Sequence, residues 1–131
     1  MKRAILLLLL PIFAIAEELL AYYSPSCGCC TSYFSKLEKE GFRVKKVAVS
    51  PERLMEVKSQ LGVPPQLRSC HTMLYKGRFV EGHVPPEAIK SLAKDKNLLG
   101  VASPHGIKSA KGGYEKNFFL VYKDKVKEVR P

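Results

Sequence analysis

The sequence predicts a single α/β domain, and three observations lead to that prediction. The chain has 131 residues, which is enough for one hydrophobic core and too few for two independent ones. Short apolar runs alternate with segments whose apolar residues recur every three or four positions, which are the patterns of strands and helices. Glycine and proline residues separate these segments. Alternating strands and helices are typical of a sheet that contains parallel neighbours.

The first half of the chain alternates two strands with two helices. Residues 19–23 form an uninterrupted apolar run, which predicts a buried strand. Residues 30–40 have apolar side chains at helical spacing and end at Gly41, a residue type that caps helices in the left-handed conformation. Residues 42–49 are rich in β-branched side chains and predict a second strand. The Ser-Pro-Glu sequence that follows predicts the start of a helix over residues 51–61.

The second half predicts a hairpin, a helix and a second hairpin. Residues 72–75 and 79–84 flank a Lys-Gly-Arg turn and predict antiparallel strands. The Pro-Pro-Glu sequence from residue 85 predicts the start of a third helix. This β-α-β-α-β-β-α order is the order of a thioredoxin-like domain. Glycine and proline residues in 98–117 predict a long loop, and residues 118–130 predict an extra C-terminal β-hairpin.

The N-terminal residues have the pattern of a secretory signal peptide. Lys2 and Arg3 precede an apolar run over residues 4–16 that ends in Ala-Ile-Ala, the small-x-small pattern that signal peptidases cleave. The run is shorter than the about 20 residues that span a bilayer. We therefore expect a signal peptide over residues 1–16, a single periplasmic metal-binding domain over residues 17–131, and no stable membrane anchor after cleavage.

The formal net charge of +10 comes from basic residues that are scattered through every segment. Proteins that bind nucleic acid concentrate such residues in a stripe or patch. No basic stripe interleaved with aromatic side chains occurs in this sequence. The charge pattern therefore indicates a solvated, lysine-rich surface, and nucleic acid is not an expected partner.

Four cysteines concentrate in two places. Cys27, Cys29 and Cys30 fall where the first strand meets the first helix, and Cys70 precedes the third predicted strand. An even number of cysteines in an exported domain can indicate disulfides, but three thiols in one loop make an awkward structural crosslink. The positive potential at a helix N-terminus is expected to ease thiol ionisation. The clustering predicts a reactive or metal-binding site.

Two histidines are expected near these cysteines. His71 follows Cys70 directly, and His83 comes at the end of the next strand, where the chain passes the same loops. Thiolates and imidazoles are both ligands of copper and zinc. His105, in the predicted loop, is expected to be a solvated residue. The candidate metal ligands are Cys27, Cys29, Cys30, Cys70, His71 and His83.

Four segments combine into a pattern that is more specific than any one of them. They are Cys27-Gly28-Cys29-Cys30, Gly62-Val63-Pro64, Leu67-Arg68-Ser69-Cys70-His71-Thr72 and Glu81-Gly82-His83-Val84-Pro85. The pattern resembles the CopG-like family of periplasmic copper-associated proteins over about residues 20–101. The resemblance implies a thioredoxin-like fold and a copper cluster held by cysteine and histidine, with a role in copper resistance. Many relatives carry methionine in the loop after the third helix, whereas residues 103–107 contain a histidine and no methionine.

Copper binding is the function that these observations favour. Thiolates select soft ions such as Cu(I), and several sulfurs can bridge more than one Cu(I) ion. We therefore expect a Cys/His multi-copper cluster that serves copper resistance, sequestration or redox handling. Copper ions and other copper-handling proteins are the expected partners.

Two alternatives stay open at this point. The first is a thiol-disulfide oxidoreductase, with Cys27 as nucleophile and Cys30 as resolving thiol. A thioredoxin-like domain normally carries a cis-proline before Thr72, and the sequence has His71 there, which disfavours this reading. The second is an interaction module stapled by zinc, the less favoured metal because zinc sites usually use well-separated pairs of C-x-x-C. Enzymatic activity, as a copper or thiol oxidoreductase, is left open.

Overall fold

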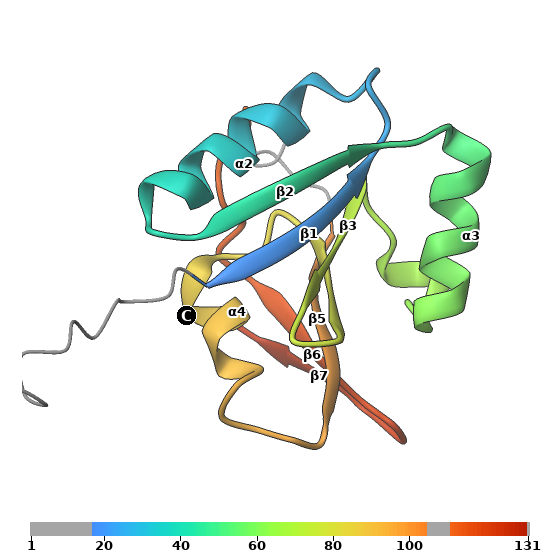
Figure 1. Ribbon diagram of the computed structural model, residues 1–131. Coiled ribbons are helices and arrows are strands. Elements are labelled where there is room, and N and C mark those ends of the chain that lie inside the picture. Colours follow the sequence, from blue (N-terminus) through green and yellow to red (C-terminus); the bar gives the residue numbers. More distant parts are fainter. Residues whose placement is uncertain (1–16, 105–110, 131) are drawn as a thin grey trace, which may run out of the picture.

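The computed structural model describes residues 17–104 and 111–130, which form one sheet flanked by helices (Figure 1). The predicted signal peptide, residues 1–16, and His105 lie outside the described residues. Within the described ranges, no helix is both long enough and apolar enough to cross a membrane.

The described residues form seven strands, three α-helices and one short 3-10 helix. Up to the third helix, their order matches the predicted β-α-β-α-β-β-α pattern. The strands are β1 (Glu18–Tyr23), β2 (Arg43–Ala48), β3 (His71–Tyr75), β4 (Arg78–Gly82), β5 (Leu98–Ser103), β6 (Phe118–Tyr122) and β7 (Val126–Val129). The helices are α2 (Gly28–Lys39), α3 (Pro51–Leu61), η1 (Pro65–Leu67) and α4 (Pro86–Ser91).

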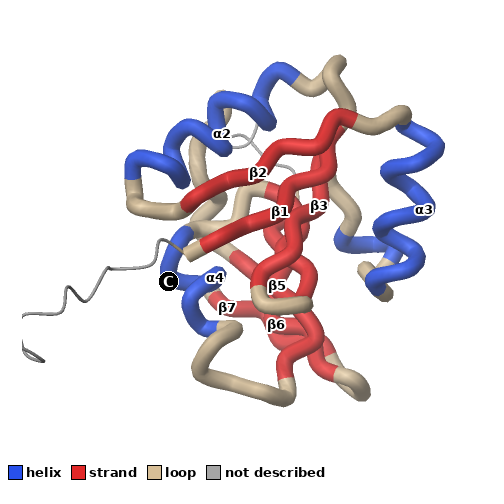
Figure 2. Tube along the Cα trace, in the orientation of Figure 1, coloured by secondary structure: helices blue, strands red, loops and turns tan. Residues whose placement is uncertain are grey.

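All seven strands belong to one mixed sheet, in the order β2-β1-β3-β4-β5-β6-β7 (Figure 2). β1 and β2 run parallel because α2 connects them, and β3 and β4 form an antiparallel hairpin. β4 and β5 are again parallel and are joined through α4. β6 and β7 pair as an antiparallel hairpin at the edge of the sheet. The predicted α/β class and the extra C-terminal hairpin are confirmed, whereas the closer thioredoxin-like assignment stays a prediction.

Helices cover both faces of the sheet. α2 and α4 lie on one face and α3 lies on the other (Figures 1 and 2). The larger core cluster, under α2 and α4, includes Tyr33, Phe34, Leu37, Met73, Val80, Ile89 and Leu92. The smaller cluster, on the face of α3, consists of Val63, Leu67, Phe79, Ala102 and Val121. Successive residues of β4, Phe79 and Val80, therefore point into different cores, as strand geometry requires.

The first turn of α2 contains the cysteine motif. Cys27 is the N-cap residue, with extended backbone angles (φ −94°, ψ 91°), and the helix begins at the next residue. Four of its side chains, Cys30, Tyr33, Phe34 and Leu37, recur at helical spacing and are fully buried. This apolar face docks α2 onto the sheet, so core packing fixes where the cysteines stand.

One strand lies where the sequence predicts a loop. The predicted loop covers residues 98–117, but its first six residues form β5 (Leu98–Ser103), a largely buried strand between β4 and β6. The prediction is wrong because Gly100, which reads as a turn signal, pairs with Phe79 across the two parallel strands. A Cβ atom at Gly100 would lie 2.5 Å from the Phe79 ring. The glycine therefore makes room for an aromatic ring inside the sheet.

Candidate metal centre

The two cysteine segments meet because β1 and β3 are neighbouring strands. Tyr23, at the end of β1, pairs with His71, at the start of β3. The chain leaves Tyr23 toward Cys27 and the first turn of α2, and it enters His71 from Cys70. Antiparallel pairing places these two points at the same end of the sheet. The pairing of β1 with β3 therefore brings together Cys27 and Cys70, which are more than forty residues apart in the sequence.

The four cysteine sulfurs form one group. The Sγ atoms of Cys27, Cys29, Cys30 and Cys70 all lie within 4.8 Å of one another, and those of Cys27 and Cys29 are 3.3 Å apart. Cys30 is fully buried, whereas the other three are half-buried. No disulfide joins cysteines in the described part of the chain. The predicted cysteine cluster is therefore confirmed.

Burial and neighbouring thiols raise the pKa of two of these cysteines. Burial raises the pKa of Cys29 to about 12, and the neighbouring Cys27 and Cys70 add to the shift. The pKa of Cys30 is raised as well, first by its hydrogen bond with Cys70 and then by burial. The expected ease of ionisation at the helix N-terminus does not hold for these two residues, because burial and hydrogen bonds between the thiols favour the protonated form. A cation bound among the sulfurs would favour the thiolates, so metal binding would release protons.

His71 lies directly against the sulfur group. It is fully buried, and its Nδ1 atom lies 3.3 Å from the Sγ of Cys30. Its Nε2 atom lies 3.0 Å from the carbonyl oxygen of Gly82. A carbonyl can only accept, so Nε2 carries the proton and the Nδ1 lone pair faces the sulfur. Burial, followed by the charges of His83 and Lys58, holds the pKa of His71 well below its usual value, which keeps the ring neutral.

His83 belongs to a cluster of three rings with His71 and Tyr33, in which the two imidazole centroids are 5.3 Å apart. The ring of Tyr33 stacks on both imidazoles, with centroid distances of 5.0 Å to His71 and 4.5 Å to His83. The Tyr33 hydroxyl donates to the carbonyl oxygen of Val84 at 2.7 Å, and Nδ1 of His83 donates to that of Gly113 at 2.8 Å. Among the described residues, the compact ligand group contains the four sulfurs and no imidazole nitrogen. The sequence predicts both histidines near the cysteines. In the structure His71 contacts Cys30, and His83 packs against His71.

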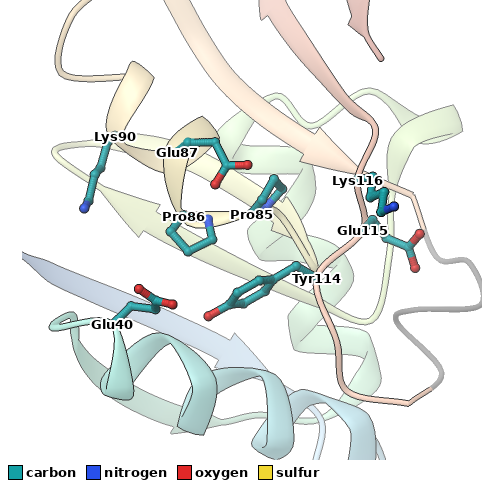
Figure 3. A pocket seen from close by; sticks show the side chains of 8 residues that line it. All are labelled: Glu40, Pro85, Pro86, Glu87, Lys90, Tyr114, Glu115 and Lys116. Carbon is teal, nitrogen blue, oxygen red and sulfur yellow. The ribbon is translucent and has the colours of Figure 1, made fainter. Parts of the chain in front are cut away.

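A surface cavity of about 880 Å³ is lined by residues of several elements (Figure 3). Its lining residues are Glu40, Pro85, Pro86, Glu87, Lys90, Tyr114, Glu115 and Lys116. Tyr114 connects the cavity to the stack, because its ring packs edge-on against Tyr33 at 5.8 Å. Burial raises the pKa of Tyr114 to about 12, and the carboxylates of Glu40 and Glu87 add to the shift. No lining residue is a thiol or an imidazole, so the cavity is separate from the sulfur group.

Sequence reasoning missed a buried polar network next to the site. Lys58 of α3, Thr72 of β3 and Glu81 of β4 are fully or almost fully buried and contact one another. The available signal was Glu81, a carboxylate inside an otherwise apolar strand, because such a group requires a partner when it is buried. The sequence does not identify that partner, since Lys58 is 23 residues away on a helix.

Comparisons with known proteins find one matching family model and two similar solved structures. A family model described as "Protein of unknown function, DUF411" matches residues 67–111. A solved structure titled "Copper resistance protein copG- Form 2" is 30% identical, with a TM-score of 0.77 over 87% of this chain and 96% of that one. A second, titled "Copper resistance protein copG- Form 1", is 30% identical, with a TM-score of 0.73 over 89% of this chain and 100% of that one. A search of curated proteins finds no match.

The similarity to the two solved structures covers most of this chain and nearly all of each relative. Identity of 30% over 96% of a relative is far more than a shared fold requires. The chain belongs to the CopG family of copper resistance proteins.

Proposed function

We propose that this protein binds copper as Cu(I) through its cysteine cluster and that it serves copper resistance. The observation that carries the proposal is the gathering of four sulfurs, from two chain segments, within 4.8 Å of one another. Thiolate is the softest ligand that a protein offers, and it selects Cu(I) over the harder divalent ions. The titles of the two related structures, which name copper resistance, support the same assignment.

The donor set fits the ion. A metal–sulfur bond of about 2.3 Å lets two sulfurs on one ion stand up to about 4.6 Å apart. The sulfurs of Cys27, Cys29, Cys30 and Cys70 therefore share ions after only small side-chain movements. Three of these residues are half-buried, so a copper ion, or a protein that delivers it, can reach the cluster from solvent. Several sulfurs bridging several ions, as in a multi-copper cluster, is the arrangement we propose.

His71 is the strongest candidate for a nitrogen ligand. Its Nδ1 lone pair already faces the Sγ of Cys30 at 3.3 Å, and the carbonyl of Gly82 fixes the ring. A hydrogen bond on the second ring nitrogen is the usual way in which proteins orient an imidazole toward a metal. His83 would bind through Nε2, because its Nδ1 is engaged by Gly113.

The setting that we propose is the periplasm. The pattern of residues 1–16 predicts export, and outside the cytosol copper must be held without a large pool of soluble thiols. Bound in the cluster, copper would be sequestered, passed to another copper-handling protein or cycled between oxidation states.

A thiol-disulfide oxidoreductase is the alternative that one observation favours. Cys27 is the half-buried N-cap of α2 and stands three residues before Cys30, as in redox-active C-x-x-C motifs. Against this, the raised pKa of Cys30 disfavours the thiolate form of the resolving cysteine, and the raised pKa of Cys29 disfavours Cys29 as a substitute for it. In addition, the Sγ of Cys27 lies 3.3 Å from that of Cys29, so Cys30 is not the one thiol within reach of Cys27.

Metal content distinguishes these functions. The reduced protein is dialysed in parallel against Cu(I), Zn(II) and no metal, and bound metal is counted by mass spectrometry. We expect more than one copper ion per chain, lost in Cys70→Ser and retained in the control Ser26→Ala, which changes an exposed side chain beside the motif. Failure to retain copper, together with turnover of a disulfide substrate, would establish the oxidoreductase instead. Tighter retention of zinc, with loss of the fold on chelation, would establish a zinc-stapled module.

A further inference from the structure

A buried ion pair lies on the α3 face of the sheet, opposite the face that carries α2. The ammonium of Lys58 contacts the carboxylate of Glu81, and the two side chains are 2% and 0% exposed. Burial raises the pKa of the Glu81 carboxyl, and the neighbouring Lys58 opposes that shift. No copper ligand is part of this pair, and the proposed copper chemistry does not use it.

The pair is connected to the cysteine site through the backbone on either side of Cys70 and His71. The backbone N–H of Ser69 donates to the Glu81 carboxylate at 2.7 Å. The hydroxyl of Thr72 donates to the other carboxylate oxygen at 2.6 Å and accepts from Lys58 at 2.8 Å. The Glu81 carboxylate therefore accepts hydrogen bonds from the residue immediately before Cys70 and from the residue immediately after His71.

The energetics of buried charges point to a positional role. The free-energy cost of removing two charges from water often exceeds the free energy gained from their attraction. Replacing a buried ion pair with apolar residues is therefore frequently neutral or stabilising. Val63, Leu67 and Phe79 supply an apolar core on the same face of the sheet. What an apolar pair could not supply is the two hydrogen bonds to Ser69 and Thr72.

We infer that Lys58 and Glu81 are positioning residues that hold the Cys70–His71 segment in the geometry that binds copper. Glu81 orients the segment, and Lys58 neutralises Glu81 and holds the Thr72 hydroxyl. The Sγ of Cys70 then faces the first turn of α2, and Nδ1 of His71 faces Cys30. The inference rests on the proposed function, and it explains why Glu81 stands within the Glu-Gly-His-Val-Pro motif.

The test uses two variants and a matched control. The double variant, Lys58→Met with Glu81→Leu, removes both charges and roughly keeps their volume. Glu81→Gln is made in the Lys58→Met background, so that no buried charge is left unpaired, and it keeps one oxygen that accepts the Ser69 N–H. The control is Lys46→Met with Glu38→Leu, which removes the ion pair at 3.4 Å between exposed side chains. Cu(I) affinity is measured by competition with a chromophoric chelator. Amide hydrogen exchange of Ser69 is measured by NMR in the metal-free protein.

We expect the double variant to fold, to exchange the Ser69 amide faster and to bind Cu(I) about 10- to 100-fold more weakly, the usual range for groups that orient ligands. Glu81→Gln should recover part of both losses, and the control should match the wild type. When Cys70→Ser is combined with the double variant, Cu(I) affinity should be only slightly lower than in Cys70→Ser alone, because both changes act through Cys70.

The opposite results would overturn the inference. Wild-type affinity and wild-type Ser69 exchange in the folded double variant would show that the pair does not position the segment. Fully additive losses with Cys70→Ser, or failure of both Glu81 variants to fold, would reduce the pair to a general stabilising role. Failure of the wild-type protein itself to bind Cu(I) would overturn the proposed function, and Ser69 exchange would still report whether Glu81 holds the segment.

Discussion

Replacing Gly82 with alanine should destabilise the fold and disturb the metal centre together. Gly82 ends β4 with a φ of +83°, in the left-handed region that favours glycine. A Cβ atom added there would lie 2.2 Å from the backbone carbonyl oxygen of Ser103 in the neighbouring β5. The carbonyl of Gly82 itself accepts the hydrogen bond from His71. A shift of this backbone therefore moves the ring that faces Cys30.

The magnitude follows from two separate costs. Holding an alanine in the left-handed region costs about 1–2 kcal/mol. Forcing a methyl group into a closely packed contact with backbone costs about 1–3 kcal/mol more. Gly77, in the β3–β4 turn, isolates the first cost, because its φ is +80° and a Cβ there would meet nothing within 4 Å. We expect losses of about 2–5 kcal/mol for Gly82→Ala and about 1–2 kcal/mol for Gly77→Ala.

The assay is urea unfolding of the metal-free protein, followed by Cu(I) competition on the folded variants. Gly82→Ala should lower the free energy of unfolding by clearly more than Gly77→Ala, and it alone should weaken Cu(I) binding. Equal losses of stability in the two variants would refute the steric argument. Unchanged Cu(I) binding in a destabilised Gly82→Ala variant would refute the link from Gly82 to His71.

Two further predictions concern the cysteine cluster and alkaline pH. Cys29→Ser should fold, because serine fills the half-buried position without leaving a cavity, and it should retain less copper by mass spectrometry because one ligand is lost. Full copper stoichiometry in this variant would show that Cys29 is not a ligand. Tyr75 is 1% exposed, and burial, followed by its hydrogen bond to Glu17, raises its pKa from 10.0 to about 12. The stability that this shift supplies is complete below about pH 10 and is lost as the pH rises toward about 12, an effect of roughly 2–3 kcal/mol. Urea unfolding across that range should show a shallower decline for Tyr75→Phe than for the wild type, and equal slopes would contradict the assignment.

The regular elements of the first half could be predicted because their signals are local. The apolar periodicity of residues 30–40 and the Ser-Pro-Glu start of α3 both depend on neighbouring residues. In the structure, Ser50 accepts the backbone N–H of Arg53 at 3.1 Å, as an N-cap should. β5 could not be predicted in this way, because the meaning of Gly100 depends on the Phe79 ring in another strand.

The site shows the same division. Cys27, Cys29 and Cys30 are adjacent in sequence, and the β-α-β order places Cys70 near them, so their meeting could be predicted. The protonation of the thiols could not, because it depends on how closely the four sulfurs crowd after folding. The Lys58–Glu81 pair escapes prediction because it joins a helix to a strand across a sheet face. No local pattern records that contact.

X-ray absorption at the copper edge of the copper-loaded protein tests the central proposal most directly, since one spectrum reports both oxidation state and ligand atoms. The account predicts a Cu(I) edge with sulfur as the main scatterer, and a reduced sulfur contribution in Cys70→Ser. A Cu(II) edge with only nitrogen and oxygen neighbours would contradict it, because copper would then be bound away from the four cysteines.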